Sequence, residues 1–260
     1  MSNSDLPAEI LDHIIDHLHD ATDSLKNCSL VSKSWIPRTR KHLFADIKFD
    51  TVKCLQSWKE AFPDPSTSPA CYAKTLFIDC VVAGADADVG DWVRGFSRVA
   101  CLELSSSDCH LAGVPPSLAT IHGFSPAITS LRINFIILPP SWFFNLVLSF
   151  PLLENLAVVI FYDGVADSGD GPLTTTEPSS TRMFTGSLEL YLMVGMGLFT
   201  RRLLSSPGGI HFRELTWTWF HEEDLSSLMA LVEGCSHALE SLDITRDFLG
   251  TSIQWLPLHR

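Results

Sequence analysis

The sequence has little positive charge and no long uninterrupted apolar run. Its 260 residues contain 18 Lys and Arg against 30 Asp and Glu, a formal net charge of −12. Nucleic acids and anionic membrane surfaces attract proteins with a positive footprint, so the charge argues against both. The most apolar window, residues 142–161, is interrupted by Asn145, Pro151, Glu154 and Asn155. A transmembrane helix needs about 20 apolar residues in succession, so we expect no membrane span.

Paired cysteines are also missing. The seven cysteines form no C-x-x-C motif, their number is odd, and several lie within apolar runs. This usage is typical of free, buried thiols in a reducing compartment. The first residues, Ser2 to Asp5, do not resemble a secretory signal. We therefore expect a cytoplasmic or nuclear protein.

Motifs that carry catalysis are absent as well. No serine lies in a G-x-S-x-G turn, and the glycine-containing run 167–171 lacks the strand and helix that a phosphate-binding loop requires. His13, Asp16 and His17 form H-x-x-D-H at helical spacing, but a third zinc ligand is missing. The sequence therefore predicts no metal, no cofactor and no catalytic residue.

What is present begins with a helical N-terminal region. Residues 7–18 predict a helix, because Pro7 and Glu9 suit a first turn and apolar residues then recur at helical spacing. A second helix is predicted after Asp23, a good N-cap residue. Chains below about 40 residues usually need a metal, disulfides or a partner to fold stably. Since the sequence offers neither of the first two here, we expect a partner.

The order of these residues resembles the F-box family over residues 4–48. The family pattern opens with L-P-x-E-I/L and ends with L-V-S/C-K/R-x-W and L-F, as this chain does between Leu6 and Phe44. The resemblance implies binding to a Skp-type adaptor and through it to a cullin. The implied adaptor contacts are Leu6, Pro7, Glu9, Ile10, Ile14, Leu18, Leu25, Leu30, Val31 and Trp35.

Two further features bear on the F-box interpretation, one against it and one in its favour. Pro37 follows the matched Trp35, and a proline there predicts the end or a kink of the helix. Lys33, Arg38, Arg40 and Lys41 form a basic cluster, which would suit an acidic adaptor. The alternative interpretation is an amphipathic helical bundle that packs on its own chain, because periodicity alone fits both.

From residue 49 onward, a short pattern of two apolar residues separated by one residue recurs. The spacings between first members are 26, 29, 25, 32, 27 and 27 residues. Alternation predicts half-buried strands, and a near-constant step predicts a solenoid. The pairs are Leu76/Ile78, Leu102/Leu104, Leu131/Ile133, Leu156/Val158, Leu188/Leu190, Leu215/Trp217 and Leu242/Ile244.

Residues 49–260 thus resemble a degenerate leucine-rich-repeat domain. Helices are predicted between the strands, and residues 163–182 predict a flexible insertion because they are rich in Gly, Ser, Thr and Pro. The expected fold class is α/β, with a three-helix F-box followed by a leucine-rich-repeat-like solenoid of parallel strands and helices. An ordinary α/β domain with parallel strands is the alternative.

Together these features predict a substrate-recognition subunit of a Skp–cullin–F-box ubiquitin ligase that is not itself an enzyme. The target protein would bind residues that flank the buried strand pairs. The alternatives are an F-box scaffold without a ligase role and an α/β enzyme. The expected target-binding residues are Glu103, Arg132, Asn134, Glu189, Tyr191, Thr216 and Asp243.

Overall fold

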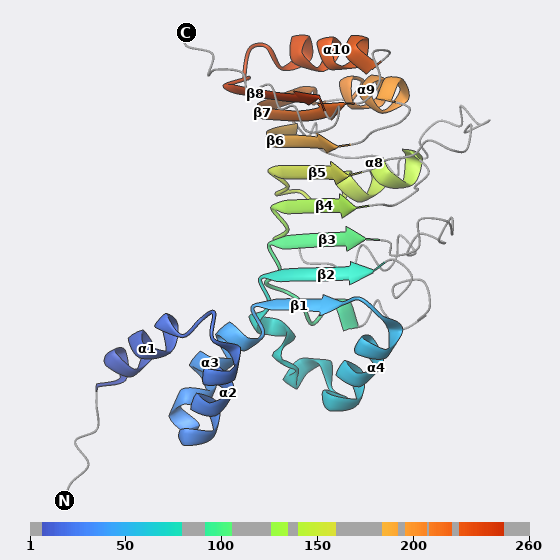
Figure 1. Cartoon of the computed structure of the whole chain (residues 1–260). Helices are drawn as coiled ribbons and strands as arrows, with labels where there is room; N and C mark the ends of the chain where they lie inside the picture. Colours follow the sequence, from blue (N-terminus) through green and yellow to red (C-terminus); the bar gives the residue numbers. More distant parts are fainter. Residues whose placement is uncertain are drawn as a thin grey trace, which may run out of the picture.

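The computed structural model of the chain combines N-terminal helices with a parallel sheet whose own helices lie between its strands in the sequence (Figure 1). The residues that the structure describes are 7–79, 92–105, 126–134, 140–159, 184–191, 196–206, 208–219 and 224–246. The expected insertion at 163–182 lies outside these residues.

The N-terminal helices form a small module, which we define as residues 7–44. It contains α1 (Ala8–His17), α2 (Thr22–Val31), the 3₁₀ turn η1 (Lys33–Trp35) and α3 (Ile36–Leu43). Pro7 is the N-cap residue of α1 and not part of its first turn as predicted, and Ala21 and not Asp23 is the N-cap of α2.

Pro37 does not end a helix, contrary to the expectation from the sequence. It lies in the first turn of α3, where the missing N–H of proline needs no partner. The helical conformation is interrupted earlier, at Ser32, where α2 ends. Ser32 has an extended backbone, and its hydroxyl accepts a hydrogen bond from the Ser34 N–H at 3.3 Å. Pro37 therefore helps to start the third helix.

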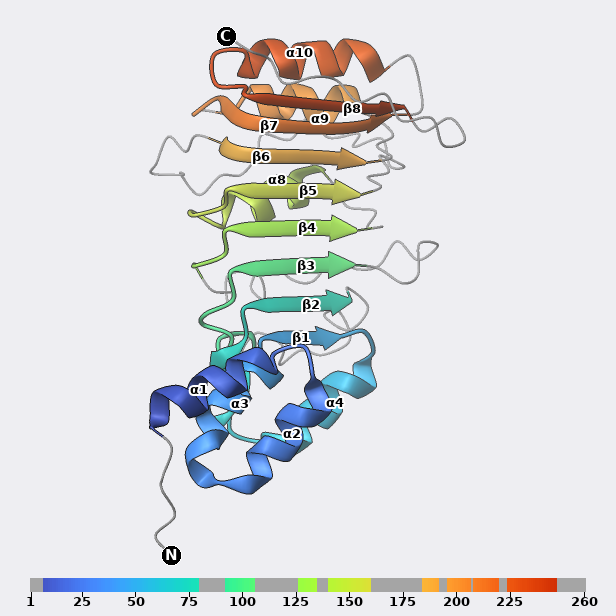
Figure 2. The same cartoon turned by 60° about the vertical axis from the view of Figure 1, so that its left-hand side comes forward.

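Eight parallel strands follow in sequence order across one sheet (Figures 1 and 2). All seven predicted strand pairs lie in strands β2 to β8. The sequence missed β1, which begins at Asp46, within the range expected for the helical module. The strands are β1 (Asp46–Phe49), β2 (Thr75–Asp79), β3 (Cys101–Ser105), β4 (Ser130–Asn134), β5 (Asn155–Val159), β6 (Phe184–Tyr191), β7 (Ile210–Trp219) and β8 (Ser241–Arg246).

The strands are in register, so each repeated apolar residue lies beside its counterpart on the next strand. One continuous row consists of Ile47, Leu76, Leu102, Leu131, Leu156, Leu188, Leu215 and Leu242. These side chains are buried, except that Leu242 is half-buried on the last strand. Because side chains alternate along a strand, the residues between them lie on the opposite face.

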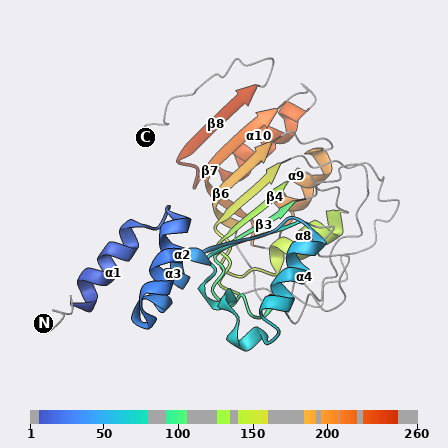
Figure 3. The same cartoon turned by 60° about the horizontal axis from the view of Figure 1, so that its bottom comes forward.

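Among the described residues, four helices lie on the apolar face of the sheet (Figure 3). They are α4 (Val52–Ala61), α8 (Pro140–Leu148), α9 (Met196–Leu204) and α10 (Leu225–Cys235), and the short 3₁₀ turns η2 (Pro65–Thr67) and η3 (Pro69–Tyr72) follow α4. The sequence predicts helices at 142–150, 198–204 and 222–232, and the last three helices overlap these segments. The sequence analysis did not predict α4. In the described part of the chain, no helix is both long and apolar enough to cross a membrane.

Aromatic side chains close the β1 end of the core. Trp58 of α4 lies 5.8 Å from Phe49, 4.7 Å from Phe62 and 6.1 Å from Phe96, measured between ring centroids. Phe44, at the end of α3, lies 6.0 Å from the same indole. The Trp58 pairs with Phe44 and Phe49 are edge-on and those with Phe62 and Phe96 are tilted, and both are favourable arrangements for aromatic rings at these distances. This cluster covers the first strand and joins it to the helical module.

Backbone hydrogen bonds tie each strand start to the preceding one. The Ala45 carbonyl accepts from the N–H groups of Lys74 and Thr75 at 2.7 and 3.0 Å, and the carbonyls of Lys74, Ala100 and Thr129 accept in the same way. Further along, the Glu154 carbonyl accepts from Ser187 at 2.9 Å. At that point Gly186 has φ +85°, and a Cβ there would lie 2.0 Å from the Glu154 oxygen. Only glycine fits this close approach.

Candidate functional site

Few side chains of the three-helix module are buried. The buried apolar side chains are Ile15 of α1 and Leu25 of α2, each 1% exposed. Thr39 of α3 is also buried, and its hydroxyl donates to a carbonyl of the preceding turn, within 3.0 Å of the Trp35 and Ile36 oxygens. A core this small leaves many other apolar side chains of the module at the surface.

A carboxylate network joins α1 to α3. Asp16 accepts hydrogen bonds from the Arg38 guanidinium, including one of 2.7 Å from Nε, and its Oδ1 lies 2.7 Å from His42 Nε2. Asp12 lies 3.9 Å from the same guanidinium. Hydrogen bonds from Arg38 first, and from His42 second, hold the pKa of Asp16 well below its ordinary value, and Asp16 in turn raises the pKa of Arg38. Arg38 thus serves the module internally and is not free for an acidic partner.

The same network includes Asp16, the carboxylate of the H-x-x-D-H pattern. The rings of His13 and His17 form a T-shaped pair with centroids 4.8 Å apart. Asp16, the carboxylate between them in sequence, is already engaged by Arg38 and His42. Among the described residues, no group of three or more His, Cys, Asp or Glu could hold a metal ion.

Most residues of the expected adaptor surface are exposed. Ile10 and Ile14 on α1 are 49% and 45% exposed, and Leu30 and Val31 at the end of α2 are 84% and 67% exposed. Pro7 and Glu9 are also exposed, whereas Leu18 and Trp35 are half-buried. Large apolar side chains at such exposure mark interaction surfaces when they gather on one part of a protein.

Two members of that expected set differ from the rest. Leu25 is buried, because it lies on the side of α2 that packs within the module. It therefore belongs to the module's own core and is not available to a partner in this conformation. Leu6 lies outside the described residues.

The second expected surface lies on the face of the sheet opposite the buried leucines, which we call the open face. A register row across it contains Glu103, Arg132, Ala157, Glu189, Thr216 and Asp243. The next row, two residues further along each strand, contains Asn134 and Tyr191. The structure therefore places all seven predicted target-binding residues on this face, from β3 to β8.

Polar contacts connect neighbouring residues of the open face. Asn134 Nδ2 donates to Glu103 Oε1 at 2.5 Å, and the Tyr191 hydroxyl donates to Glu189 at 3.4 Å. Arg132 of β4 lies 3.7 Å from Glu189 of β6, and the small Ala157 of β5 lies between them in the same row. Burial first, and the negative charge of Glu189 second, raise the pKa of Tyr191. The face is therefore mixed in charge, with a central ion pair.

Comparison with known proteins identifies the N-terminal region. A family model described as F-box-like matches residues 3–36, which contain α1, α2 and η1. No curated protein matches the chain. The chain therefore contains an F-box-like domain, and domains of this kind typically bind a Skp-type adaptor.

Proposed function

We propose that this chain is the substrate-recognition subunit of a Skp–cullin–F-box ubiquitin ligase, acting in the cytoplasm or nucleus without catalytic residues of its own. The observation that carries the proposal is the exposure of Ile10, Ile14, Leu30 and Val31 on the helices matched by the F-box-like family. Its contribution to ubiquitin transfer would be to hold a target close to the enzyme that modifies it, since proximity accelerates reactions.

The sheet domain would act as a leucine-rich-repeat-like solenoid that binds the target. Its sequential strands, common register and near-constant step support this, because stacked repeats build a continuous core and one continuous surface. The open face combines Arg132, Glu189, Tyr191 and Asp243, and Tyr and Arg are common binding anchors. A mixed polar face suits a protein partner better than a small apolar ligand.

Adaptor binding is tested by titrating a purified Skp-type adaptor into the full chain. Ile14→Glu and Leu30→Glu place charges where an apolar contact is expected, and each should weaken binding by about 2 kcal/mol or more, roughly thirtyfold. Met229→Glu is the matched control, because Met229 is 61% exposed but lies on α10 of the sheet domain. Equal binding by all four proteins would contradict the assignment of the adaptor surface.

The ligase role requires a second measurement. The full chain is expressed in cells with the proteasome inhibited, and co-purified proteins are compared between the wild type and the Ile14→Glu/Leu30→Glu double variant. A ligase subunit should recover adaptor and cullin together with ubiquitinated targets, and the double variant should lose adaptor and cullin while retaining targets. Recovery of adaptor without cullin would instead favour a scaffold without a ligase role.

A further inference from the structure

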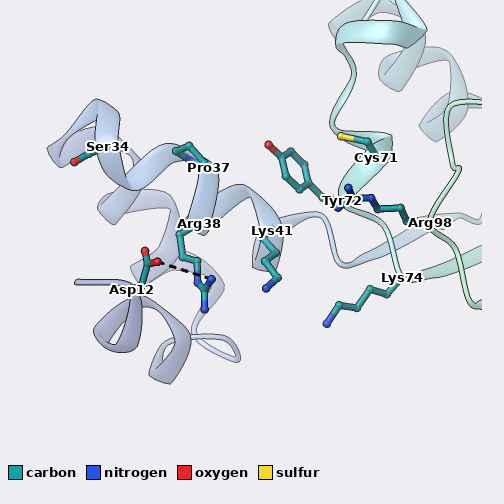
Figure 4. A pocket seen from close by; sticks show the side chains of 9 residues that line it. All are labelled: Asp12, Ser34, Pro37, Arg38, Lys41, Cys71, Tyr72, Lys74 and Arg98. Carbon is teal, nitrogen blue, oxygen red and sulfur yellow. Dashed lines mark ion pairs between the residues drawn. The ribbon is translucent and has the colours of Figure 1, made fainter. Parts of the chain in front are cut away.

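A basic cleft lies at the junction of the helical module and the first strands (Figure 4). Its volume is about 520 Å³, within the range of about 300–1,000 Å³ that is typical of ligand sites. The walls come from α1 and α3 on one side, and from η3 and the residues before β2 and β3 on the other. Four basic side chains line it: Arg38, Lys41, Lys74 and Arg98.

Within the described part of the chain, three of these cations have no acidic partner. Asp12 is the only acidic residue among the described residues that line the cleft, and it lies beside Arg38, which Asp16 already engages. Among the residues that the structure describes, Lys41, Lys74 and Arg98 have no carboxylate within ion-pair distance. Such a concentration of unpaired cations stands out in a chain with a net charge of −12.

The three cations come from separate elements and line the same cleft. Lys41 is on α3, Lys74 directly precedes β2, and Arg98 precedes β3. Figure 4 shows Lys41 and Lys74 pointing into the space between the module and the sheet, and Arg98 extending toward Tyr72. Like charges gathered around one cleft repel one another, so an extended anion bound there would gain from all three.

We propose that this cleft binds a small polyphosphate anion. Lysine ammonium groups and the forked guanidinium of arginine are the usual ligands of phosphate oxygens. The Tyr72 hydroxyl, which has no hydrogen-bond partner in the described structure, adds a neutral donor. A ligand with two or more phosphate groups fits the spread of the cations over three elements better than a single phosphate does.

The bound anion would also connect the two parts of the chain. Lys41 belongs to the helical module, whereas Lys74 and Arg98 belong to the sheet domain. A ligand held by all three would therefore oppose hinge motion between the module and the sheet, and would fix how an adaptor and a target are oriented. The binding itself does not depend on the ligase role.

The test uses isothermal titration of the full chain with inorganic tripolyphosphate at low salt. We expect tripolyphosphate to bind, single phosphate to bind at least about tenfold more weakly, and the affinity for tripolyphosphate to fall as salt rises. Lys74→Ala and Arg98→Ala should each raise the Kd by about tenfold or more. Lys53→Ala is the matched control, because Lys53 is an exposed cation on α4 outside the cleft, and it should change the Kd by less than about twofold.

Two further ligands distinguish the source of the negative charge. Citrate tests whether any small polyanion suffices, and a soluble Glu-rich peptide tests an acidic protein segment. The proposal is overturned if tripolyphosphate does not bind at about 1 mM, if Lys53→Ala weakens it as much as Lys74→Ala, or if citrate or the peptide binds more tightly. Thermal unfolding of each variant without ligand confirms that any change in affinity is not a loss of fold.

Discussion

The helical module and the sheet domain treat their apolar residues in opposite ways. In the sheet domain, apolar side chains from Ile47 to Leu239 form one continuous buried core. In the module, only Ile15 and Leu25 are buried apolar side chains, and neither belongs to that core. Of the seven large exposed apolar side chains among the described residues, four lie in the module: Ile10, Ile14, Leu30 and Val31.

This contrast separates stability from binding. The sheet domain completes its core with its own helices, so its apolar residues should act on the free energy of unfolding. The module leaves four of its large apolar side chains exposed, so these residues should act on association with a partner. The same substitution should therefore have different effects in the two regions.

The largest expected effect compares two leucines. Leu131→Ala removes a fully buried side chain of β4 and should lower the free energy of unfolding by about 2–5 kcal/mol. Leu30→Ala removes a side chain that is 84% exposed and should change it by about 0.5 kcal/mol or less. Urea unfolding of both variants measures the difference. Equal destabilisation would show that the module is not distinct from the core.

A second pair compares two glycines of the sheet domain. Gly186→Ala forces an L residue to φ +85° and places its Cβ against the Glu154 carbonyl, which should destabilise by at least about 1–3 kcal/mol. Gly197→Ala lies in α9 with open space around the new methyl group, and should be neutral or stabilising by up to about 1 kcal/mol. Thermal unfolding distinguishes them, and a harmless Gly186→Ala would refute the tight strand junction.

Much of the sheet could be predicted because its signal is local and repeated. The pairs from Leu76/Ile78 to Leu242/Ile244 identify seven strands, and the structure pairs them in the same register. Strand β1 was missed because Ile47 and Phe49 follow α3 almost directly, without a turn signal between helix and strand. Helix α4 was missed although Val52, Leu55 and Trp58 recur at helical spacing, and the structure shows that it packs through the aromatic cluster around Trp58.

The candidate site was predictable only in part. An excess of apolar residues over what three short helices can cover is visible in the sequence. The sequence does not show which of these residues point inward. For that reason Leu25 was expected in the adaptor surface although it is buried. The basic cleft could not be predicted, because Lys41, Lys74 and Arg98 are far apart in the sequence and only the fold brings them together.

The carboxylate network offers a pH-dependent test of the module. Asp16→Asn removes the acceptor shared by Arg38 and His42, and should destabilise the module. Because Arg38 and His42 lower the pKa of Asp16 in the folded state, the stabilisation is complete above the unfolded value of about 3.9, declines as the pH falls below that value, and is lost as the pH falls through the lowered pKa of the folded state. Helix content followed by circular dichroism should thus differ most between wild type and variant near neutral pH.

Asp23→Asn is the control for this experiment. Asp23 forms only an exposed pair with Lys26 at 3.2 Å, so its loss should have little effect at any pH. A difference between wild type and Asp16→Asn that does not shrink between neutral pH and about pH 2 would show that the charge of Asp16 is not what joins α1 to α3.

The smallest expected effect on stability concerns the open face. Arg132 and Glu189 form an ion pair at 3.7 Å with side chains 47% and 34% exposed, so breaking it should cost about 1 kcal/mol or less. Arg132→Glu should nevertheless reduce target capture in the co-purification experiment and leave adaptor binding unchanged, because the adaptor surface lies in the module. Glu233→Lys, an exposed charge reversal on α10 of the covered side, should change neither.

The double variant Arg132→Glu/Glu189→Arg then separates two explanations for lost capture. It restores an ion pair between the same two positions but exchanges the charges that a target would meet. If the target contacts these side chains directly, capture stays low, because the partner's own charges now face like charges. Restored capture would mean that the pair only holds the face in shape, and target recognition would then have to lie elsewhere on the sheet domain.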